Sequence, residues 1–417
     1  MSHWLPAATT ASSSKPAMPV QPADHAKLMR CLVLAQQSIG LSDPNPRVGC
    51  VLHDAKGTFA GEGYTQHAGG PHAEVMALRD ARTRGADLHG GTAWVSLEPC
   101  AHYGRTPPCS DALIEAGLAR VVVATVDPFP QVAGQGLARL RAAGIEVVVA
   151  EGEVALAARE LNIGFFSRVI RSRPWVRMKL DASIAGRTAL PNGASQWITG
   201  PPARLDGQRW RQRAQAVLTG IGTVLADNPR LDVRDIPTTL QPLRVVLDSS
   251  WRTPLDARIL RPPGDVLVIG ARPDTTRQAA LHASGARTWH PPDVTVAGTV
   301  APDVVLTMLA GLGVNELHVE AGPNLSGAWL ANGAVDELVL YLAPRLLGPG
   351  RPLADLPEVH ALDQAIGLQM VDVQPVGGDL RMRLITDAVD APVMAPEGER
   401  LYPVLAERYG LEEDYLR

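Results

Sequence analysis

The spacing of apolar residues along the chain predicts two stretches in which strands and helices alternate. Residues 1–22 are rich in Ala, Ser, Thr and Pro and show almost no periodicity, which is typical of a disordered leader. From Asp24 to Gly40 the apolar residues recur at helical spacing, and the glycine marks a helix end. Val-rich runs then alternate with amphipathic segments, which predicts strands at 48–54, 92–98, 119–127 and 144–151 and helices at 73–82, 110–119 and 134–144.

This alternation predicts a first α/β domain over 23–150, built on a largely parallel sheet. Residues 151–172 are helical and then basic, and we expect them to form a connector. A second α/β domain is expected over 173–387, with strands at 175–180, 216–220, 243–248, 265–271, 316–322 and 336–344. Residues 388–417 form an acidic C-terminal tail, for which a solvated helix is favoured over an interaction segment.

Composition narrows the class of protein. The formal net charge of −4 gives no electrostatic reason to expect a nucleic-acid partner or an anionic membrane surface. No apolar run approaches the ~20 residues that span a bilayer, and the N-terminus lacks the layout of a signal peptide. Four cysteines in 417 residues are too few for a disulfide framework. We therefore expect a cytoplasmic protein with reduced thiols, in which paired cysteines indicate a metal or catalysis.

Two of the four cysteines lie in one short stretch, EPCAHYGRTPPC. Cys100 follows an expected strand and Cys109 opens an expected helix, where the free N–H groups favour a thiolate. His72 follows a proline at the start of another helix, and Glu74 stands two residues later, on a different face of that helix. One His and two thiolates can hold Zn²⁺ and leave a position for water, while a nearby Glu that is not a ligand carries protons.

A closed structural zinc site is the alternative, and it would need a fourth ligand. The two remaining cysteines, Cys31 on a helix stripe and Cys50 on a strand, are more simply interpreted as buried small apolar residues. We therefore favour a catalytic zinc site over a structural one.

The second domain lacks the G-x-G-x-x-G fingerprint of dinucleotide-binding domains, since TGIGT (219–223) has no third glycine. The stretch EAGPNLSG (320–327) is a better phosphate site, because it follows an expected strand and opens an expected helix. From the residues alone, a simple strand-to-helix turn remains the more economical interpretation of this stretch.

Several long motifs, in order, resemble the bifunctional deaminase/reductase family of riboflavin biosynthesis. The first half carries PNPRVG (44–49), HAEVMAL (72–78), SLEPCAHYGRTPPC (96–109) and DPFPQVAGQG (127–136). The second half carries RPWVRMKLDASIAGRT (173–188), SQWITG (195–200), AVLTGIGTVLADNPRLDVR (216–234) and VEAGPNLSGAWL (319–330). The eight residues between the two cysteines are the special feature of this family, because other zinc deaminases have two.

The resemblance implies a cytidine-deaminase-like α/β/α sandwich followed by a dihydrofolate-reductase-like α/β domain. It implies two reactions, with Zn²⁺ and NADPH as cofactors. The first is hydrolytic deamination of 2,5-diamino-6-ribosylamino-4(3H)-pyrimidinone 5′-phosphate. The second reduces the ribosyl group of that product and gives 5-amino-6-ribitylaminouracil 5′-phosphate. We also expect a homo-oligomer.

The resemblance also implies a role for individual residues. The expected zinc ligands are His72, Cys100 and Cys109, and Glu74 is the expected proton carrier. The residues that match substrate contacts of the family are Asn45, His102, Arg105, Ser195, Arg211, Leu231, Arg234 and Glu320. The residues that match its NADPH contacts are Lys179, Ser183, Trp197, Thr223, Asp227, Ser249, Gly322, Pro323, Asn324, Leu325, Ser326, Gly327 and Ala328.

Two other functions compete with this interpretation. A nucleoside or tRNA base deaminase with a folate-reductase-like appendage is one alternative, and the cysteine spacing and the lack of a basic face count against it. A structural zinc module joined to a nucleotide-binding domain is the other.

Overall fold

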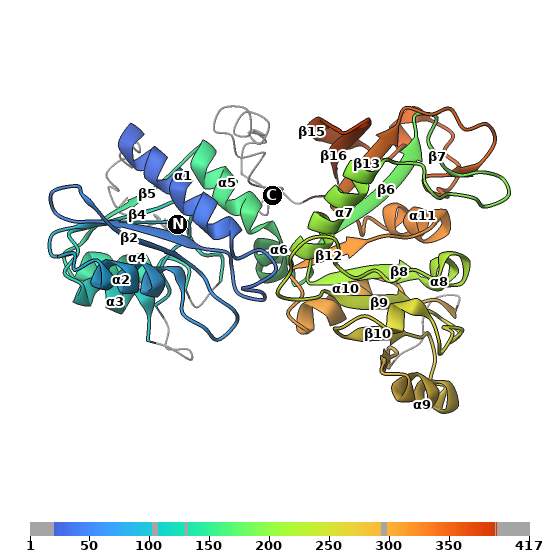
Figure 1. The fold of residues 1–417 in the computed structure, drawn as a ribbon, viewed down its shortest axis with the longest axis horizontal. Coiled ribbons are helices and arrows are strands. Elements are labelled where there is room, and N and C mark those ends of the chain that lie inside the picture. The colour runs from blue at the N-terminus through green and yellow to red at the C-terminus, as the bar shows by residue number, and fades with distance from the viewer. Residues whose placement is uncertain (1–20, 102–106, 130–131, 293–297, 388, 390–417) are drawn as a thin grey trace, which may run out of the picture.

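The computed structural model describes residues 21–101, 107–129, 132–292, 298–387 and 389. They form two α/β units, with helix α6 (Ile163–Arg171) between them (Figure 1). The first helix, α1 (Pro22–Gln36), begins at the last residue of the expected leader. Residues 1–20, 388 and 390–417, which include nearly all of the expected leader and tail, lie outside the described part of the chain.

The first unit is built on a five-stranded sheet of order β2-β1-β3-β4-β5. The strands are β1 (Gly49–His53), β2 (Phe59–Tyr64), β3 (Thr92–Val95), β4 (Arg120–Val123) and β5 (Glu146–Val149). The pairs β3–β4 and β4–β5 are parallel, but β1 is antiparallel to both β2 and β3. The prediction of a largely parallel sheet was therefore wrong for this edge. The turn that joins β1 to β2 is too short for a parallel crossover, which needs a dozen or more residues.

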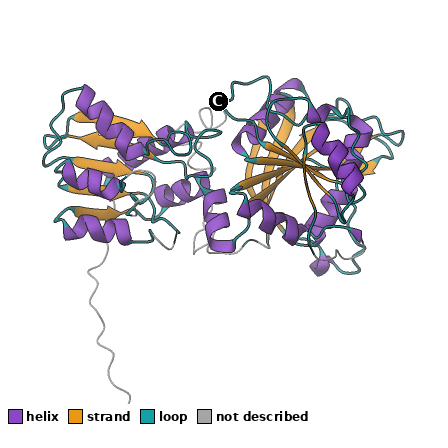
Figure 2. Cartoon of the chain, turned by 90° about the horizontal axis from the view of Figure 1, so that it is seen from below, coloured by secondary structure: helices purple, strands orange, loops and turns teal. Residues whose placement is uncertain are grey.

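Helices cover both faces of this sheet (Figures 1 and 2). Alternate residues of the strands point to opposite faces, so Cys50 and Leu52 pack with one helical layer and Val51 with the other. The first layer contains α2 (Ala73–Thr83), α3 (Cys109–Glu115) and α4 (Gln135–Ala142), and the second contains α1 and α5 (Glu153–Leu161). The expected α/β/α sandwich is thereby confirmed.

The second unit is built on a nine-stranded sheet of order β11-β10-β9-β8-β12-β6-β13-β16-β15. Every neighbouring pair from β11 to β13 is parallel, and β16 and β15 continue the sheet in antiparallel orientation. The strands of this sheet are β6 (Trp175–Ser183), β8 (Ala216–Gly220), β9 (Leu243–Leu247), β10 (Val266–Ile269), β11 (Arg287–Trp289), β12 (Glu316–Val319), β13 (Glu337–Ala343), β15 (Leu368–Val376) and β16 (Asp379–Thr386). Two short strands, β7 (Arg187–Ala189) and β14 (Arg351–Pro352), pair separately.

Helices lie on both sides of this sheet as well (Figure 2). Side chains of α10 (Pro302–Gly311) and α11 (Pro323–Ala331) share an apolar cluster with one face, through residues such as Met178. Side chains of α7 (Pro201–Arg213), α8 (Ile221–Asp227) and α9 (Thr275–Ala283) pack on the other face. Arg177 and Lys179 alternate with the apolar residues of β6, so the α7 face of that strand carries charge.

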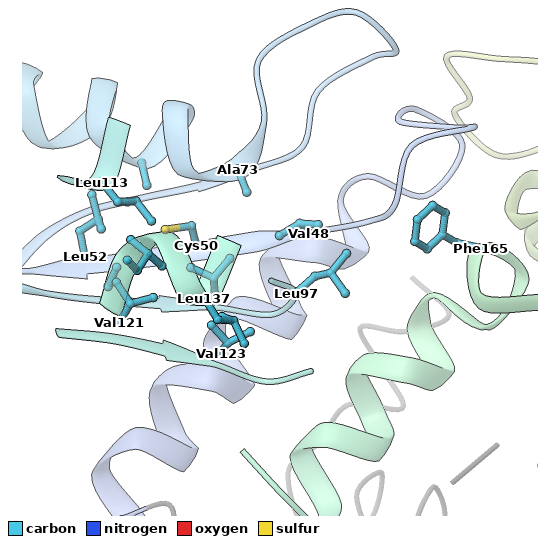
Figure 3. Close-up of a cluster of buried hydrophobic side chains, with 14 of the residues drawn as sticks. Val48, Cys50, Leu52, Ala73, Leu97, Leu113, Val121, Val123, Leu137 and Phe165 are labelled. Atoms are coloured by element: carbon cyan, nitrogen blue, oxygen red, sulfur yellow. The ribbon is translucent and has the colours of Figure 1, made fainter. Parts of the chain in front are cut away.

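The expected connector is folded into the molecule. Val154, Ala158 and Leu161 of α5 are buried in the cluster that contains α1. Phe165 of α6 belongs to the apolar cluster between the first sheet and helices α2, α3 and α4. Figure 3 shows this cluster with Val48, Cys50 and Leu97. The same cluster extends to Trp175, Val371 and Ile385 of the second unit, so the two units share apolar packing. Among the described residues, no helix is both long and apolar enough to pass through a membrane.

Candidate active sites

Helix α2 carries two of the predicted site residues, and two glycines of β2 allow it to lie directly on the sheet. A Cβ on Gly63 would stand 2.5 Å from the Cβ of Met76, and one on Gly61 would stand 2.6 Å from the Ala77 carbonyl oxygen. Such contacts are closer than side chains tolerate, so only glycine permits this packing. The packing fixes the start of α2, where His72 is the N-cap residue and Glu74 lies in the first turn.

The loop that follows β3 carries Cys100, and a buried carboxylate holds it in place. Glu98 is 3% exposed, and its Oε1 accepts hydrogen bonds from the amides of Gly136 at 2.9 Å and Leu137 at 3.3 Å. Its Oε2 accepts from the amides of Gly134 at 2.9 Å and Asp127 at 3.3 Å. Glu98 thus joins the loop after β3 to the start of α4, at a point two residues before Cys100.

The structure brings together the three predicted ligands. Nδ1 of His72 lies 3.7 Å from Sγ of Cys100 and 3.4 Å from Sγ of Cys109. The donor atoms of all three residues lie within 4.8 Å of one another, and in the described part of the chain this is the group with metal-binding geometry. His72 comes from the start of α2, Cys100 from the loop after β3, and Cys109 from the start of α3.

This donor set fits zinc. With Zn–S near 2.3 Å and Zn–N near 2.0 Å, two ligands of a tetrahedral ion stand about 3.5 Å apart, close to the separations found here. One imidazole nitrogen and two sulfurs also match the ligand chemistry that zinc prefers. Three protein ligands leave the fourth tetrahedral position for water. The remaining cysteines, Cys31 and Cys50, are buried in apolar clusters, as expected.

The helix start at α3 acts on Cys100 rather than on Cys109. The backbone N–H of Cys109 donates to Sγ of Cys100 at 3.3 Å. Hydrogen bonds from Cys109 lower the pKa of Cys100 to about 4, although burial opposes that change. The pKa of Cys109 is raised, first by its hydrogen bond to Cys100 and then by burial. That Cys109 is also a thiolate stays a prediction, while the free amide at this helix start points toward the Cys100 sulfur.

Glu74 is suited to proton transfer near neutral pH. Its side chain is 3% exposed. Burial raises its pKa to about 7, although the neighbouring His72 opposes this. A carboxyl group with such a pKa can both accept and release a proton at neutral pH.

The structure describes one of the three predicted substrate contacts in this half. Asn45 is half-buried in the turn that leads into β1, and its amide donates to the Ser42 carbonyl oxygen at 3.0 Å. His102 and Arg105 lie outside the described residues.

In the second unit, several of the predicted residues lie at one edge of the sheet, among them Thr223, Gly322 and Glu320. Strands β6, β8, β9 and β12 are parallel, so their carboxyl ends meet at this edge, where ligands bind in open α/β sheets. The N-terminus of α8 follows β8, and the N-terminus of α11 follows β12. A Cβ on Gly322 would stand 3.9 Å from Oγ1 of Thr223, so the two helix starts are neighbours. Their free N–H groups favour a phosphate at this point.

A buried ion pair lies at the same edge. Arg211 of α7 donates to both carboxylate oxygens of Glu320, from Nε at 2.5 Å and from Nη2 at 2.8 Å, and its Nη1 donates to the Asp232 carbonyl oxygen at 3.1 Å. Burial alone would raise the pKa of Glu320, but Arg211 and His318 reverse this and hold it well below its usual range. Glu320 is therefore ionised at neutral pH and has a fixed orientation.

The remaining predicted residues take different positions. Lys179 contacts Asp181, and its Nζ lies 5.2 Å from the centre of the Tyr341 ring. Ser183 is buried, and its hydroxyl oxygen accepts a hydrogen bond from the Arg187 amide at 3.2 Å. Trp197 is 58% exposed, with the Arg204 guanidinium 4.4 Å from its ring. Ser195 and Ser249 are half-buried and Asp227 is exposed, while Arg234 has a side chain 39% exposed beside Asp232. In α11, Ser326 and Gly327 are buried and the others are more accessible, namely Pro323, Asn324, Leu325 and Ala328.

Leu231 is a predicted substrate contact whose side chain is buried in an apolar cluster. Its side chain is 3% exposed and packs with Ile221 and Trp251 in an apolar cluster. A ligand could therefore reach only its backbone, which has a positive φ of 53°.

Sequence reasoning missed several polar residues of both sites. Glu98 is one, although its place next to the Pro–Cys pair was a possible signal. His318 is another: it is fully buried on β12, with Nε2 3.3 Å from Oε1 of Glu320. The strand pattern ELHVE places His318 and Glu320 on one face, but it did not show that this face was buried.

The first unit and its donor set define a zinc-binding deaminase of the cytidine deaminase type. Residues 22–125 match the family model for the "cytidine and deoxycytidylate deaminase zinc-binding region". Residues 174–382 match the model for the "RibD C-terminal domain". The chain belongs to the RibD family, and it is a bifunctional deaminase/reductase of riboflavin biosynthesis.

Relatives and solved structures cover nearly the whole described chain. The riboflavin biosynthesis protein RibD of Escherichia coli is 44% identical over an alignment of 383 residues, and the match covers 87% of this chain and 99% of that protein. The RibD of Aquifex aeolicus is 38% identical, over 84% of this chain and 94% of that protein. The structure of Acinetobacter baumannii RibD superposes with a TM-score of 0.78 at 39% identity, covering 87% of this chain and 98% of that one.

A structure from Thermotoga maritima extends the comparison to a more distant relative. It is described as a diaminohydroxyphosphoribosylaminopyrimidine deaminase/5-amino-6-(5-phosphoribosylamino)uracil reductase. Its TM-score is 0.77 at 28% identity, and the match covers 87% of this chain and 98% of that one.

Proposed function

We propose that this chain deaminates 2,5-diamino-6-ribosylamino-4(3H)-pyrimidinone 5′-phosphate and then reduces the ribosyl group of the product with NADPH. The first reaction is assigned to residues 23–150 and the second to residues 173–387. The observation that carries the proposal is the His72–Cys100–Cys109 donor set beside buried Glu74, on a chain whose second sheet also presents a ligand-binding edge. The names of the relatives, above all the one from Thermotoga maritima, supply the substrate class.

In the deaminase half, His72, Cys100 and Cys109 would hold the zinc ion. Zinc bound there would supply the polarisation that turns water into a nucleophile near neutral pH. Glu74 accepts a proton from the nucleophile and delivers it to the amino group that leaves as ammonia, because its pKa of about 7 permits both steps. Asn45, His102 and Arg105 are assigned to hold the substrate, and Arg105 can pair with its phosphate.

In the reductase half, the starts of α8 and α11 would hold the phosphates of NADPH through their N–H groups. NADPH supplies the hydride, and the residues of the chain supply position and charge. Glu320, fixed by Arg211, faces the same edge and is assigned to orient the sugar hydroxyls. Arg234, whose guanidinium is partly exposed, is assigned to the phosphate of the substrate.

A coupled assay on the one substrate tests both halves of the proposal. The chain should release ammonia from the pyrimidine phosphate without NADPH, and should then oxidise NADPH in proportion to the ammonia released. Ammonia release with no later NADPH oxidation would reject the second half. Release of ammonia from cytidine or an RNA stem-loop, and none from the pyrimidine phosphate, would reject the first half.

A further inference from the structure

The loop that carries Asn45 is attached to the reductase half at several points. This loop, residues 43–47, is part of the connection between α1 and β1. Nδ2 of Asn315, at the start of β12, donates to the Pro44 carbonyl oxygen at 3.0 Å and to Oδ1 of Asp43 at 3.3 Å. Arg168 of α6 donates to the same Pro44 oxygen at 3.4 Å. These partners of the deaminase loop come from parts of the chain more than a hundred residues away.

Arg47 is the last residue of this loop and makes buried contacts with the reductase half. Its side chain is buried, and Nη1 donates to Oε1 of Glu316 at 2.8 Å while Nη2 donates to the Arg213 carbonyl oxygen at 2.8 Å. Its backbone is held as well, because Asn162 accepts from its N–H at 2.7 Å and donates to its carbonyl oxygen at 2.9 Å. The side chain of a residue from the deaminase half is thus fixed by the reductase half, and its backbone is fixed by Asn162 of the connector.

We infer that Arg47 is a positioning residue of the deaminase reaction, which sets the place of Asn45 through its buried contact with Glu316 of the reductase domain. This inference rests on the proposed function, because Asn45 is assigned there as a substrate contact. Neither residue of the pair belongs to the zinc site or is assigned to NADPH.

The local chain transmits the position of Arg47 to Asn45. Pro44 and Pro46 stand on either side of Asn45, and each fixes its own φ and restricts the residue before it. The Asn45 carbonyl oxygen accepts from Oγ of Ser42 at 3.2 Å, which closes the turn on its other side. With these torsions restricted, a shift of residue 47 moves Asn45 with it instead of being absorbed by the chain between them.

The substitution Arg47→Met tests the inference. It also removes the 3.7 Å pairing of Arg47 Nη2 with the buried carboxylate of Asp43, which keeps its hydrogen bond from Nδ2 of Asn315 at 3.3 Å. Glu316 keeps two other arginines in that variant, with Arg177 Nη1 at 2.7 Å and Arg213 Nε at 2.8 Å, so the fold should persist. We expect the KM for the pyrimidine phosphate in deamination to rise about tenfold while kcat changes little, because Asn45 contacts the substrate before and during the reaction. Zinc content and NADPH-dependent reduction of the deaminated intermediate should match the wild type.

Arg383→Met is the matched control. Arg383 is also buried and forms ion pairs at the junction, with Nη2 2.9 Å from Oε1 of Glu160 and Nε 2.7 Å from Oε1 of Glu337, and both of these carboxylates lie outside the loop. A general loosening of the junction would raise the deamination KM in both variants. The inference expects the rise in Arg47→Met alone.

Hydrogen exchange gives a readout that does not depend on the substrate. In Arg47→Met the backbone amides of residues 42–49 should exchange faster than in the wild type and in Arg383→Met. An unchanged KM together with unchanged exchange, or equal effects in both variants, would overturn the inference. A wild-type chain that fails to deaminate the pyrimidine phosphate would refute the proposed function instead, and the exchange data would still decide whether Arg47 sets the loop.

Discussion

Single side chains decide the chemistry of the deaminase site, and their burial matters more than their spacing. His72 and Glu74 are two residues apart on one helix start, yet only His72 has its donor atom in the metal-binding group. Glu74 is buried beside that group, where desolvation raises its pKa to about 7. The proposed function therefore gives the two residues separate tasks, metal binding for His72 and proton transfer for Glu74.

Replacing Glu74 with glutamine should separate these two tasks. Gln keeps the shape of the side chain but cannot carry a proton, so deamination should fall by about 10³-fold or more. Zinc content and NADPH oxidation with the deaminated intermediate should be unchanged. Elemental analysis and the two assays measure these quantities, and loss of zinc in the variant would show that the role of Glu74 has been misassigned.

Arg211 offers the equivalent test in the reductase half. Lysine cannot reproduce the two parallel hydrogen bonds from Arg211 to Glu320. Arg211→Lys should therefore lower kcat/KM for reduction by about 10²-fold, because Glu320 loses its fixed orientation. Ammonia release should stay at the wild-type rate.

The control for this variant is Arg209→Lys on the same helix. Arg209 forms a long ion pair with Asp206, at 3.9 Å, and its side chain is 30% exposed. Equal losses of reduction in both variants would mean that α7 as a whole was disturbed and that the pairing with Glu320 has no special importance.

At the scale of elements, tight contacts between short segments hold the site. A Cβ on Gly136, at the start of α4, would stand 2.0 Å from the Pro99 carbonyl oxygen. Gly136→Ala should therefore push Pro99 and the adjacent ligand Cys100 out of place. We expect the dissociation constant for zinc to rise about 10- to 100-fold, as it does when other supports of a metal ligand are removed. Competition with a chromophoric chelator measures it.

Gly311→Ala is the control for this change, because nothing lies within 4 Å of a Cβ built at Gly311, the last residue of α10. Wild-type zinc affinity in Gly136→Ala would contradict the supporting role of this contact.

Most elements with strong apolar patterns could be predicted from the sequence, and most with weak patterns could not. Strand β16 is an exception, because it was missed although Leu380, Met382 and Leu384 alternate with arginines. All the expected strands were found, because each is a compact Val- or Leu-rich run. Strand β2 was missed because two glycines and Glu62 interrupt it, and β15 because it is a largely exposed edge strand with a proline. In both cases tertiary contacts, rather than a local pattern, select the strand.

The same distinction applies to the site. The grouping of His72, Cys100 and Cys109 could be predicted, because the two cysteines lie nine residues apart at the two ends of one loop and His72 begins another helix. The contact between Arg47 and Glu316 spans 269 residues of sequence, and no local pattern marks either partner. Ion pairs between distant segments become visible only when the fold has brought them together.

At the scale of the whole molecule, buried ion pairs make stability depend on pH. Burial alone would raise the pKa of Glu337, but Arg177 and Arg383 reverse this and lower it to about 2. A carboxyl group with a lowered pKa in the folded state stabilises the fold above its unfolded pKa of about 4.3, and this contribution is lost as the pH falls toward 2.

Glu337→Gln should remove this dependence. At pH 7 the free energy of unfolding of the variant should be lower than that of the wild type by about 3 kcal/mol. The two free energies should converge as the pH approaches 2. Urea unfolding at a series of pH values measures the difference. Glu358→Gln, at an exposed position, is the control and should follow the wild type. If the difference in the free energy of unfolding between Glu337→Gln and the wild type stayed constant across this pH range, the ion pairs of Glu337 would not be the cause of the pH dependence.

The apolar cluster between the first sheet and helices α2, α3 and α4 includes Phe166, Trp175 and Ile385. A ribosome makes the chain from its N-terminus, so Ile385 of β16 emerges long after the zinc ligands have been synthesised. Until then the nascent deaminase half lacks part of its hydrophobic packing and exposes the surface that this packing will cover. Premature termination before β16 should therefore yield fragments in which both halves are incomplete, and these fragments would be substrates for chaperones and proteases.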